Sequence, residues 1–374
     1  MCYFWRGKGT FFRLMVTDEK YILRCIELAR LGAGNVSPNP MVGCVIVNNE
    51  KIIGEGFHRE YGGAHAEVNA IAAVSDQELL GGSTLYVTLE PCAHHGNTPP
   101  CADLIVEKRI PKVVIGTIDP FAKVAGKGIE KLRKAGVDVE VGVLETECRD
   151  LNKRFFTFHE KIRPYVILKW AQTLDGFIDV DREQEDYGEP TWITGGLALR
   201  LVHKIRSEED AILVGYNTAR KDNPSLTVRH WAGRNPLRAV IDKNLELPDN
   251  LNLFDGFAKT LIFNGISNDK SRMGDLVKIN FENNQVPQIL GELYRRNVLS
   301  VIVEGGKKLL ESFILSGLWD EAHVFIGNKL FLAGVQAPKI TEKVIESEAL
   351  DFDWIEIFRN SHQNTMPLGP SGMI

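Results

Sequence analysis

Apolar residues recur with two different periods over the first 150 residues of the chain, and this pattern predicts alternating helices and strands. The residues from Ile22 to Ala29 have helical spacing, which predicts a helix over 18–31 that ends at Gly32. The predicted strands are 42–47, 51–57, 84–88, 112–117 and 137–143, and the other predicted helices are 65–74, 102–108 and 128–135. Strands that alternate with helices in this way are typical of a layered α/β domain.

A second α/β series begins after Pro164. Its predicted strands are 165–170, 211–215, 238–241, 259–263 and 300–303, and its predicted helices are 197–206, 287–297 and 307–315. Between the two series the apolar pattern is lost and the chain turns basic and polar. We therefore predict two domains, 17–150 and 164–374, with a linker over 151–163 and an N-terminal extension of unknown role over 1–16. The region from Glu342 onward is irregular and predicts no element.

Composition agrees with this organisation. A chain of 374 residues is long for one core, and 44% hydrophobic with 25% charged residues is typical of a soluble globular protein. The net charge of −5 disfavours nucleic acid as a partner. No apolar run approaches the roughly 18 residues that cross a membrane, so we expect no membrane partner. Six cysteines do not make a disulfide framework in a chain of this length, which favours a cytoplasmic location.

The first 16 residues are aromatic and basic but lack the continuous apolar stretch and the small-residue cleavage site of a signal peptide. We expect a disordered tail or translation from an upstream start codon. A homo-oligomer is compatible with the sequence, which does not determine the oligomeric state.

Three short strings carry a histidine, a carboxylate and two cysteines: His65-Ala66-Glu67, Glu90-Pro91-Cys92 and Pro99-Pro100-Cys101. One imidazole and two thiolates are a typical zinc ligand set, and three protein ligands leave the fourth position to water. We predict that His65, Cys92 and Cys101 bind zinc, which lets bound water lose a proton near neutral pH. Glu67 diverges from His65 by about 200° on a regular helix, so we predict that it moves protons during catalysis. This constellation is typical of zinc-dependent nucleobase deaminases.

A structural zinc site is the alternative interpretation of the same cysteines. It needs a fourth protein ligand, for which His94, His95 and Cys44 are the candidates. The His65-Ala66-Glu67 string favours the catalytic interpretation, because a structural site has no use for the carboxylate.

The order of motifs over 17–146 resembles the deaminase half of the bifunctional riboflavin-biosynthesis deaminase/reductase family. The motifs are Pro38-Asn39-Pro40-Met41-Val42-Gly43-Cys44, Gly56-Phe57-His58, His65-Ala66-Glu67, the stretch from Glu90 to Cys101 with eight residues between its cysteines, and Asp119-Pro120. The resemblance implies a cytidine-deaminase-like three-layer αβα fold. It also implies a diaminopyrimidinone substrate with a phosphoribosylamino group, whose ring amino group is released as ammonia.

The same resemblance implies that Asn39, His58, His94 and Asp119 contact the base or the ribose. Asn97 stands where the family often has a lysine or arginine. Lys123 is a candidate to replace that basic group.

The second half resembles the reductase half of the same family over 164–327. Its motifs are Lys169-Trp170-Ala171-Gln172-Thr173-Leu174-Asp175-Gly176, Trp192-Ile193-Thr194, Ile205-Arg206, Asp210 to Gly215, Asp222 to Arg229, and Glu304-Gly305-Gly306. The resemblance implies a dihydrofolate-reductase-like α/β fold and NADPH, which transfers a hydride to C1′ of the ribose and opens it to ribityl. The glycines of the last motif precede a predicted helix, and bare amides there suit a pyrophosphate.

The resemblance assigns two further sets of residues in the second half. The cofactor set is Gln172, Trp192, Thr218, Asp222, Gly306 and Lys307, and the substrate set is Arg206, Leu226, Arg229 and Glu304, with Lys169 and Asp175 near the reacting ribose. A guanidinium group can bind a phosphate through two hydrogen bonds, which suits both arginines. A surface ion pair is the alternative for each arginine alone.

Three other functions remain alternatives. A nucleoside or transfer-RNA deaminase with an unrelated second domain would need no NADPH, and the acidic net charge and the long gap between Cys92 and Cys101 disfavour it. Two binding modules without catalysis would tolerate loss of Glu67. A working deaminase with a decayed reductase is the third, and the presence of the reductase motifs disfavours it.

Overall fold

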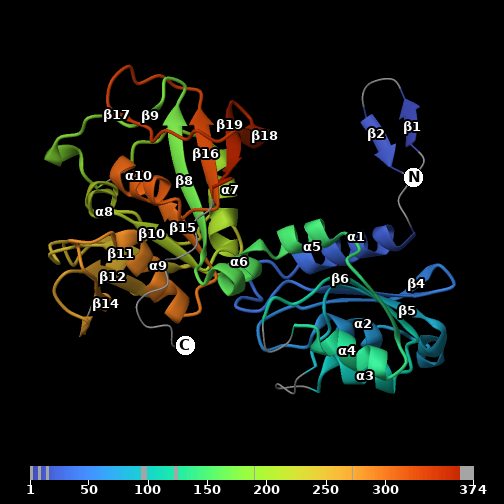
Figure 1. Ribbon diagram of the computed structural model, residues 1–374. Helices are drawn as coiled ribbons and strands as arrows, with labels where there is room; N and C mark the ends of the chain where they lie inside the picture. The colour runs from blue at the N-terminus through green and yellow to red at the C-terminus, as the bar shows by residue number, and fades with distance from the viewer. Residues whose placement is uncertain are drawn as a thin grey trace. The chain divides into compact units, whose positions relative to one another are not determined.

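The computed structural model describes residues 3–6, 10–13, 17–93, 99–121, 125–188, 190–271 and 273–362 (Figure 1). The chain divides into two compact units, Met1–His159 and Glu160–Ile374. No helix in the described ranges has the length and apolarity needed to cross a membrane.

The first unit is built on a five-stranded sheet with the order β4-β3-β5-β6-β7. Its strands are β3 (Gly43–Asn48), β4 (Lys51–Phe57), β5 (Thr84–Leu89), β6 (Lys112–Thr117) and β7 (Asp138–Val141). Strand β3 is antiparallel to both of its neighbours, whereas β5, β6 and β7 are parallel. The helices are α1 (Thr17–Arg30), α2 (Ala66–Ala72), α3 (Cys101–Glu107), α4 (Lys127–Lys134), α5 (Glu145–Leu151) and α6 (Lys153–Lys161), with a 3-10 turn over Gln77–Gly82.

Side chains that alternate along the buried strands give this sheet two apolar faces. In β3, Cys44 and Ile46 pack with α2, α3 and α4, while Val45 and Val47 pack with α1 and α5. These layers confirm the predicted three-layer αβα architecture (Figure 1). Gly56 lets α2 lie directly against β4, since a Cβ there would come within 2.3 Å of a backbone nitrogen of α2.

Two segments of the first unit differ from the sequence expectation. Residues 151–163, predicted to be a polar linker, are largely helix α6, because Phe155, Phe156 and Phe158 form a buried face that the surrounding basic residues obscure. Within 1–16, where a disordered tail was expected, β1 (Tyr3–Arg6) and β2 (Thr10–Arg13) form an antiparallel pair.

The second unit is built on a ten-stranded sheet with the order β13-β14-β12-β11-β10-β15-β8-β16-β19-β18. The seven strands from β14 to β16 in this order are parallel, and the three outer strands β13, β19 and β18 are antiparallel to their neighbours. The strands are β8 (Tyr165–Thr173), β10 (Ala211–Val214), β11 (Leu237–Ile241), β12 (Thr260–Asn264), β13 (Lys270–Ser271), β14 (Gly274–Lys278), β15 (Ser300–Glu304), β16 (Glu321–Gly327), β18 (Val344–Leu350) and β19 (Asp353–Arg359). A separate pair joins β9 (Phe177–Asp179) and β17 (Val335–Gln336).

Helices cover both faces of the ten-stranded sheet. The helices are α7 (Gly196–Glu208), α8 (Tyr216–Asp222), α9 (Gln285–Arg295) and α10 (Lys307–Ser316), with 3-10 turns over Gln184–Asp186 and Asn252–Phe254. Helices α9 and α10 pack on one face against β8 and β15, and α7 and α8 contribute to separate apolar clusters that use the opposite side chains of the same sheet.

The prediction of no element beyond Glu342 is wrong. Strands β18 and β19 form a hairpin that extends the sheet beyond β16. Six of the seven residues of β18 are exposed, so its sequence lacks the apolar alternation by which a strand is recognised. In β19, Ile355 and Ile357 pack toward α7 while Trp354 and Phe358 pack toward the other face.

A fully buried ion pair joins the start of β8 to the start of β16. Arg163 donates two hydrogen bonds to the Asp320 carboxylate, at 2.5 and 2.9 Å, and both side chains are 0% exposed. The backbone N–H of Val166 donates to the same carboxylate at 2.8 Å. The pair therefore fixes two adjacent strands of the second unit.

We expect Asp320→Ala to lower the free energy of unfolding of the second unit by about 3–5 kcal/mol, because it leaves the Arg163 guanidinium buried without its counter-charge. Urea denaturation monitored by circular dichroism measures the change. Glu130→Ala is the control, since Glu130 pairs with Lys134 at the surface, where the side chains are 61% and 74% exposed, and we expect a change within about 0.5 kcal/mol. Equal effects of the two substitutions would contradict the role of the buried pair.

Candidate active sites

The three predicted zinc ligands meet in the first unit. His65 Nδ1 lies 3.6 Å from Cys92 Sγ and 3.3 Å from Cys101 Sγ, and the three ligand atoms are all within 4.8 Å of one another. Tetrahedral zinc with bonds of about 2.0–2.3 Å holds such atoms about 3.6 Å apart. The residues therefore fit a zinc ion, and no other such group occurs among the residues that the structure describes.

Each ligand occupies the end of a secondary-structure element. His65 is the N-cap residue of α2 rather than part of its first turn, Cys92 follows β5, and Cys101 begins α3 after Pro100. A hydrogen bond from Cys101 lowers the pKa of the Cys92 thiol, although burial opposes this shift. The backbone N–H of Cys101 also donates to Cys92 Sγ at 3.3 Å. The loop thus stabilises the thiolate form that binds metal.

Glu67 lies beside the ligands without being one of them. Its side chain is 3% exposed, and burial raises its pKa to about 7 although His65 opposes the shift. A carboxyl group with such a pKa can take up and release a proton near neutral pH.

The described residues supply three zinc ligands, which is the number that a catalytic site uses. Of the candidates for a fourth ligand, Cys44 lies in the apolar core beneath α2, α3 and α4, and it does not belong to the ligand group. His94 and His95 fall outside the described residues, as do Asn97 and Lys123.

Asn39 and His58 form a hydrogen-bonded chain next to the zinc ligands. His58 Nδ1 lies 3.0 Å from the carbonyl of Ala64, so Nδ1 carries the proton and Nε2 accepts from Asn39 Nδ2 at 3.1 Å. The His58 ring packs edge-on against the His65 ring with centroids 5.6 Å apart, and burial lowers the pKa of His58. His58 therefore orients Asn39, whose amide oxygen faces away from this hydrogen bond.

Glu90 has a structural role that the sequence analysis did not predict. Its carboxylate is 4% exposed and accepts hydrogen bonds from the backbone N–H groups of Gly126 and Gly128, at 2.9 and 2.8 Å, and from Asp119 at 3.4 Å. Glu90 thus ties the Cys92 loop to the segment after β6 that carries Asp119. In the sequence, the position of Glu90 directly before Pro91-Cys92 was the signal that could have indicated this role.

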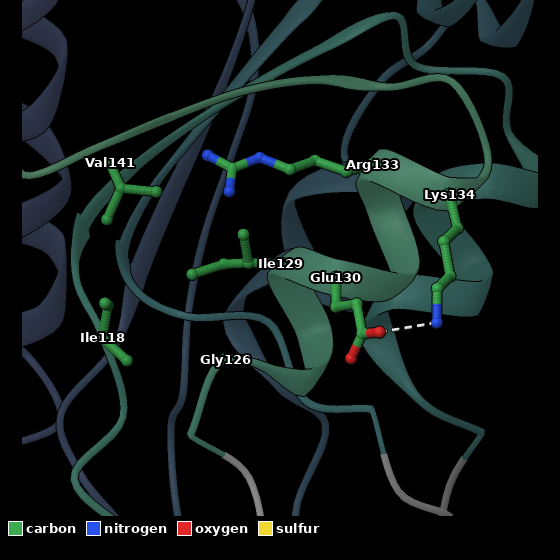
Figure 2. Close-up of a pocket in the computed structure, with 7 residues that line it drawn as sticks. All are labelled: Ile118, Gly126, Ile129, Glu130, Arg133, Lys134 and Val141. Carbon is green, nitrogen blue, oxygen red and sulfur yellow. Dashed lines mark hydrogen bonds and ion pairs between the residues drawn. The ribbon is translucent and has the colours of Figure 1, made fainter.

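A hollow of about 610 Å³ lies beside α4, away from the predicted ligands. Figure 2 shows Ile118, Ile129 and Val141 turned toward one another, with the Glu130–Lys134 ion pair at the rim. None of the predicted site residues lines this hollow.

In the second unit, Glu304 joins two of the predicted substrate residues. Arg206 Nε and Nη2 donate to the Glu304 carboxylate at 3.1 and 2.8 Å, and Lys169 Nζ lies 4.0 Å from it. Burial alone would raise the pKa of Glu304, but the charges of Arg206 and Lys169 lower it to about 2. Burial lowers the pKa of Lys169 despite Glu304. The Arg206 ion pair is buried rather than at the surface, with side chains 10% and 12% exposed.

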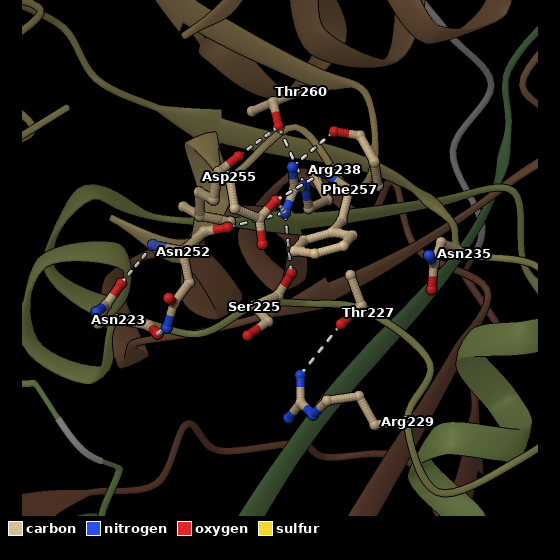
Figure 3. A network of polar contacts seen from close by, with 12 residues as sticks. Asn223, Ser225, Thr227, Arg229, Asn235, Arg238, Asn252, Asp255, Phe257 and Thr260 are labelled. Atoms are coloured by element: carbon tan, nitrogen blue, oxygen red, sulfur yellow. Dashed lines mark hydrogen bonds and ion pairs between the residues drawn. The ribbon is translucent and has the colours of Figure 1, made fainter. Parts of the chain in front are cut away.

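The predicted substrate residues Leu226 and Arg229 belong to a segment that Arg238 anchors (Figure 3). The Arg238 side chain is completely buried and donates to the carbonyls of Ser225, Asn252 and Ala258, at 3.3, 2.9 and 2.6 Å, as well as to Asp255 and Thr260. Leu226, the next residue, is buried with a left-handed φ of 52°.

Arg229 points away from the Arg238 network and donates to Thr227 Oγ1 at 3.2 Å (Figure 3). No ion pair joins it to a carboxylate within the described ranges, and burial together with the charge of Arg206 lowers its pKa. The sequence missed Arg238, although a single arginine inside an apolar strand was a signal for a buried charge.

The cofactor candidates gather after adjacent parallel strands. Strands β10 and β15 are neighbours, so the segments that follow them lie at the same edge of the sheet. There the backbone N–H of Gly306 donates to Thr218 Oγ1 at 2.9 Å, and Lys307 begins α10. At the other end of α8, Asp222 pairs with Arg182.

The remaining candidates lie around β8. Gln172 accepts from Trp170 Nε1 at 2.8 Å, and Trp192 is 56% exposed. The Asp175 carboxylate accepts from the Thr173 hydroxyl and from the backbone N–H groups of Phe331 and Leu332, at 2.5, 3.2 and 2.7 Å. Through these hydrogen bonds Asp175 stabilises the turn after β8.

The fold and the three-ligand metal site define a zinc-dependent deaminase domain followed by a second α/β domain. Comparison with family models agrees: residues 15–117 match the cytidine and deoxycytidylate deaminase zinc-binding region, and residues 164–354 match the RibD C-terminal domain. The riboflavin biosynthesis protein RibD of Synechocystis sp. is 40% identical over 331 residues, which cover 87% of this chain and 88% of the relative. RibD of Escherichia coli is 35% identical over 336 residues, covering 84% and 88%.

Two solved structures are similar over nearly the whole chain. A diaminohydroxyphosphoribosylaminopyrimidine deaminase/5-amino-6-(5-phosphoribosylamino)uracil reductase from Thermotoga maritima has a TM-score of 0.83 and 39% identity, covering 92% of this chain and 99% of that one. Acinetobacter baumannii RibD has a TM-score of 0.82 and 31% identity, covering 92% and 98%. The chain therefore belongs to the RibD family of riboflavin biosynthesis proteins.

The family assignment confirms a deaminase fused to a reductase, with Zn²⁺ and NADPH as cofactors. The dihydrofolate-reductase-like fold predicted for the second half is likewise confirmed. The alternatives of an unrelated second domain and of two non-catalytic binding modules are thereby wrong.

We expect Cys101→Ala to reduce bound zinc from about one ion per chain to a small fraction of that, because two ligands hold zinc far less tightly than three. Elemental analysis of the purified protein measures the metal content. Cys148→Ala is the matched control, since Cys148 is a buried free cysteine on the opposite face of the sheet and should leave zinc unchanged. Full zinc occupancy in the Cys101 variant would contradict the ligand assignment.

Proposed function

We propose that the first domain deaminates 2,5-diamino-6-(5-phosphoribosylamino)pyrimidin-4(3H)-one to 5-amino-6-(5-phosphoribosylamino)uracil, and that the second domain reduces the ribose of this product to ribityl. The observation that carries the proposal is the set of three zinc ligands beside buried Glu67. The deaminase/reductase from Thermotoga maritima is similar to 92% of this chain, which supports the proposal.

In the deaminase domain, zinc bound by His65, Cys92 and Cys101 would supply a hydroxide nucleophile near neutral pH. Glu67 takes one proton of the attacking water and delivers it to a ring nitrogen, and it then carries the proton of the new hydroxyl group to the amino group, which leaves as ammonia. Asn39, held by His58, offers its amide oxygen to a donor group of the substrate. Asp119 and His94 complete the proposed substrate contacts.

In the reductase domain, NADPH would supply the hydride that C1′ gains. As the C1′–O4′ bond breaks, its electron pair stays on O4′, which takes up a proton. Lys169 is suited to provide that proton, because burial lowers the pKa of its ammonium group and so makes it a stronger acid, while Glu304 lies 4.0 Å from Nζ. Arg206 retains Nη1 for the substrate while its other nitrogens hold Glu304, and Arg229 adds a second guanidinium group.

The cofactor contacts proposed for this domain are Thr218, Gly306 and Lys307 at the end of β15, with Gln172, Trp192 and Asp222 around them. The substrates are small molecules, so no nucleic-acid or membrane partner is required. Reduced metal-binding thiolates and the use of NADPH both favour the cytoplasm, and a homo-oligomer is compatible with this function.

Incubation of the purified protein with the diaminopyrimidinone substrate tests the proposal. We expect ammonia release that does not need NADPH, followed by NADPH oxidation only after deamination.

We expect Glu67→Gln to keep its zinc and to lower the rate of ammonia release by roughly 10²-fold or more, because the amide cannot carry the proton. Metal analysis is the control for that variant, and appreciable ammonia release with zinc in place would contradict the role of Glu67.

We expect Arg206→Ala to raise KM for the phosphorylated intermediate in the reduction step by roughly tenfold or more, since a hydrogen bond from a charged group is lost. Ammonia release should be unchanged. Arg206→Lys is the matched variant, because it keeps a positive charge near Glu304 but loses the paired N–H groups, and its defect should be smaller. Equal loss of both activities would argue against separate sites.

A further inference from the structure

His203 is a completely buried histidine that no step described so far uses. It lies on α7 one turn before Arg206, and its ring packs edge-on against that of His230 with centroids 4.8 Å apart. It is therefore placed among the groups proposed to bind the substrate of the reductase, although no motif in the sequence pointed to it.

One hydrogen bond fixes where the His203 proton resides. The backbone N–H of Arg229 donates to His203 Nδ1 at 3.1 Å. A backbone amide can only donate, so Nδ1 is the unprotonated nitrogen and the neutral ring carries its proton on Nε2. Burial and the charges of Arg206 and Arg229 lower the pKa of His203 to about 4, which keeps the ring neutral near pH 7.

The Nε2–H group is a donor without an acceptor. Nε2 is buried and has no hydrogen-bond partner in the described part of the chain. Buried polar groups in folded proteins nearly always have a partner, from the protein, from water or from a ligand. An unpaired donor beside the proposed binding site thus indicates where an acceptor atom of the ligand lies.

The charges around His203 select the kind of acceptor. The charged and titratable groups that change the pKa of His203 are Arg206 on its own helix, Arg229 and His230 from the loop after α8, and Glu304 from β15. Glu304 is already held by Arg206, whereas Arg229 has no carboxylate partner within the described ranges. An oxygen of an anionic group would satisfy both Arg229 and the unpaired donor.

We propose that His203 is a substrate-binding residue of the reductase domain, whose Nε2–H donates to an oxygen of the substrate phosphate while Nδ1 fixes the backbone of Arg229. The inference rests on the proposed function, since it takes the phosphorylated product of deamination as the ligand. Two nitrogens of one ring would thereby link the position of Arg229 to recognition of the same phosphate.

Two substitutions separate the two nitrogens. His203→Asn places an amide oxygen near Nδ1 and so keeps the acceptor for Arg229 but loses the Nε2 donor. His203→Gln places an amide nitrogen near Nε2 and so keeps the donor but loses that acceptor. Ser207→Ala is the control for disturbance of α7, since the Ser207 hydroxyl bonds only the backbone carbonyl of Lys204 among its described contacts.

We expect His203→Asn to raise KM for the phosphorylated intermediate and the inhibition constant of inorganic phosphate by roughly tenfold each, as loss of a hydrogen bond to an anion implies. KM for NADPH and the rate of ammonia release should stay within about twofold, as should all constants of Ser207→Ala. The Gln variant should bind inorganic phosphate better than the Asn variant. Unchanged phosphate inhibition in His203→Asn, or a parallel rise in KM for NADPH, would overturn the proposal.

A measurement on the wild-type protein makes the test independent of variant folding. With ¹⁵N-labelled histidine, NMR should show His203 as the Nε2–H tautomer, and inorganic phosphate should shift the Nε2 resonance. The Nδ1–H tautomer, or a resonance that phosphate leaves in place, would also overturn it. If the wild-type protein failed to oxidise NADPH with the intermediate, the proposed function would fail first, which distinguishes the two outcomes.

Discussion

Parallel pairing of buried strands is the constraint on which both sites depend. Parallel strands meet with their carboxyl ends at one edge of the sheet, so the segments that follow them lie close together. In the first unit, β5 and β6 deliver the Cys92 loop and Asp119 to the same edge. In the second, β10 and β15 deliver Thr218 and Gly306, which share a hydrogen bond of 2.9 Å. The same arrangement thus places residues far apart in the sequence within reach of one ligand.

Buried carboxylates fix chain segments at the ends of the strands. Glu90 accepts hydrogen bonds from the backbone N–H groups of Gly126 and Gly128 after β6, whereas Asp320 accepts them from Val166 and Arg163 at the opposite edge of its sheet, where β8 and β16 begin. A buried carboxylate is tolerated only when it has such partners, since an unpaired buried charge is strongly unfavourable. These hydrogen bonds therefore hold the backbone of Gly126, Gly128 and Val166 in place.

The sequence predicted the zinc ligands, all five strands of the first sheet and five of the ten strands of the second, because these signals are local. His65, Cys92 and Cys101 stand in short strings whose residue types suffice to identify zinc chemistry. The ion pair between Arg206 and Glu304 was not predicted, since it joins residues 98 apart that share a site only after the sheet forms. Arg238 and His203 were not predicted for the same reason, because their roles depend on loops that are distant from them in the sequence. The exposed strand β18 lacked an apolar pattern altogether.

Burial acts on two carboxyl groups of this protein with opposite results, and the neighbours decide which. Glu67 lies beside thiols, and its pKa rises to about 7 because burial outweighs the opposing effect of His65. Glu304 lies beside Arg206 and Lys169, and its pKa falls to about 2 because two cations outweigh burial. The first group can therefore carry a proton, whereas the second stays ionised and holds its cations in place. Glu67 lies at the zinc ligands of the first domain, whereas Glu304 is paired with Arg206 and lies 4.0 Å from Lys169 in the second. The difference between the two carboxyl groups thus arises from the charges placed around one type of side chain.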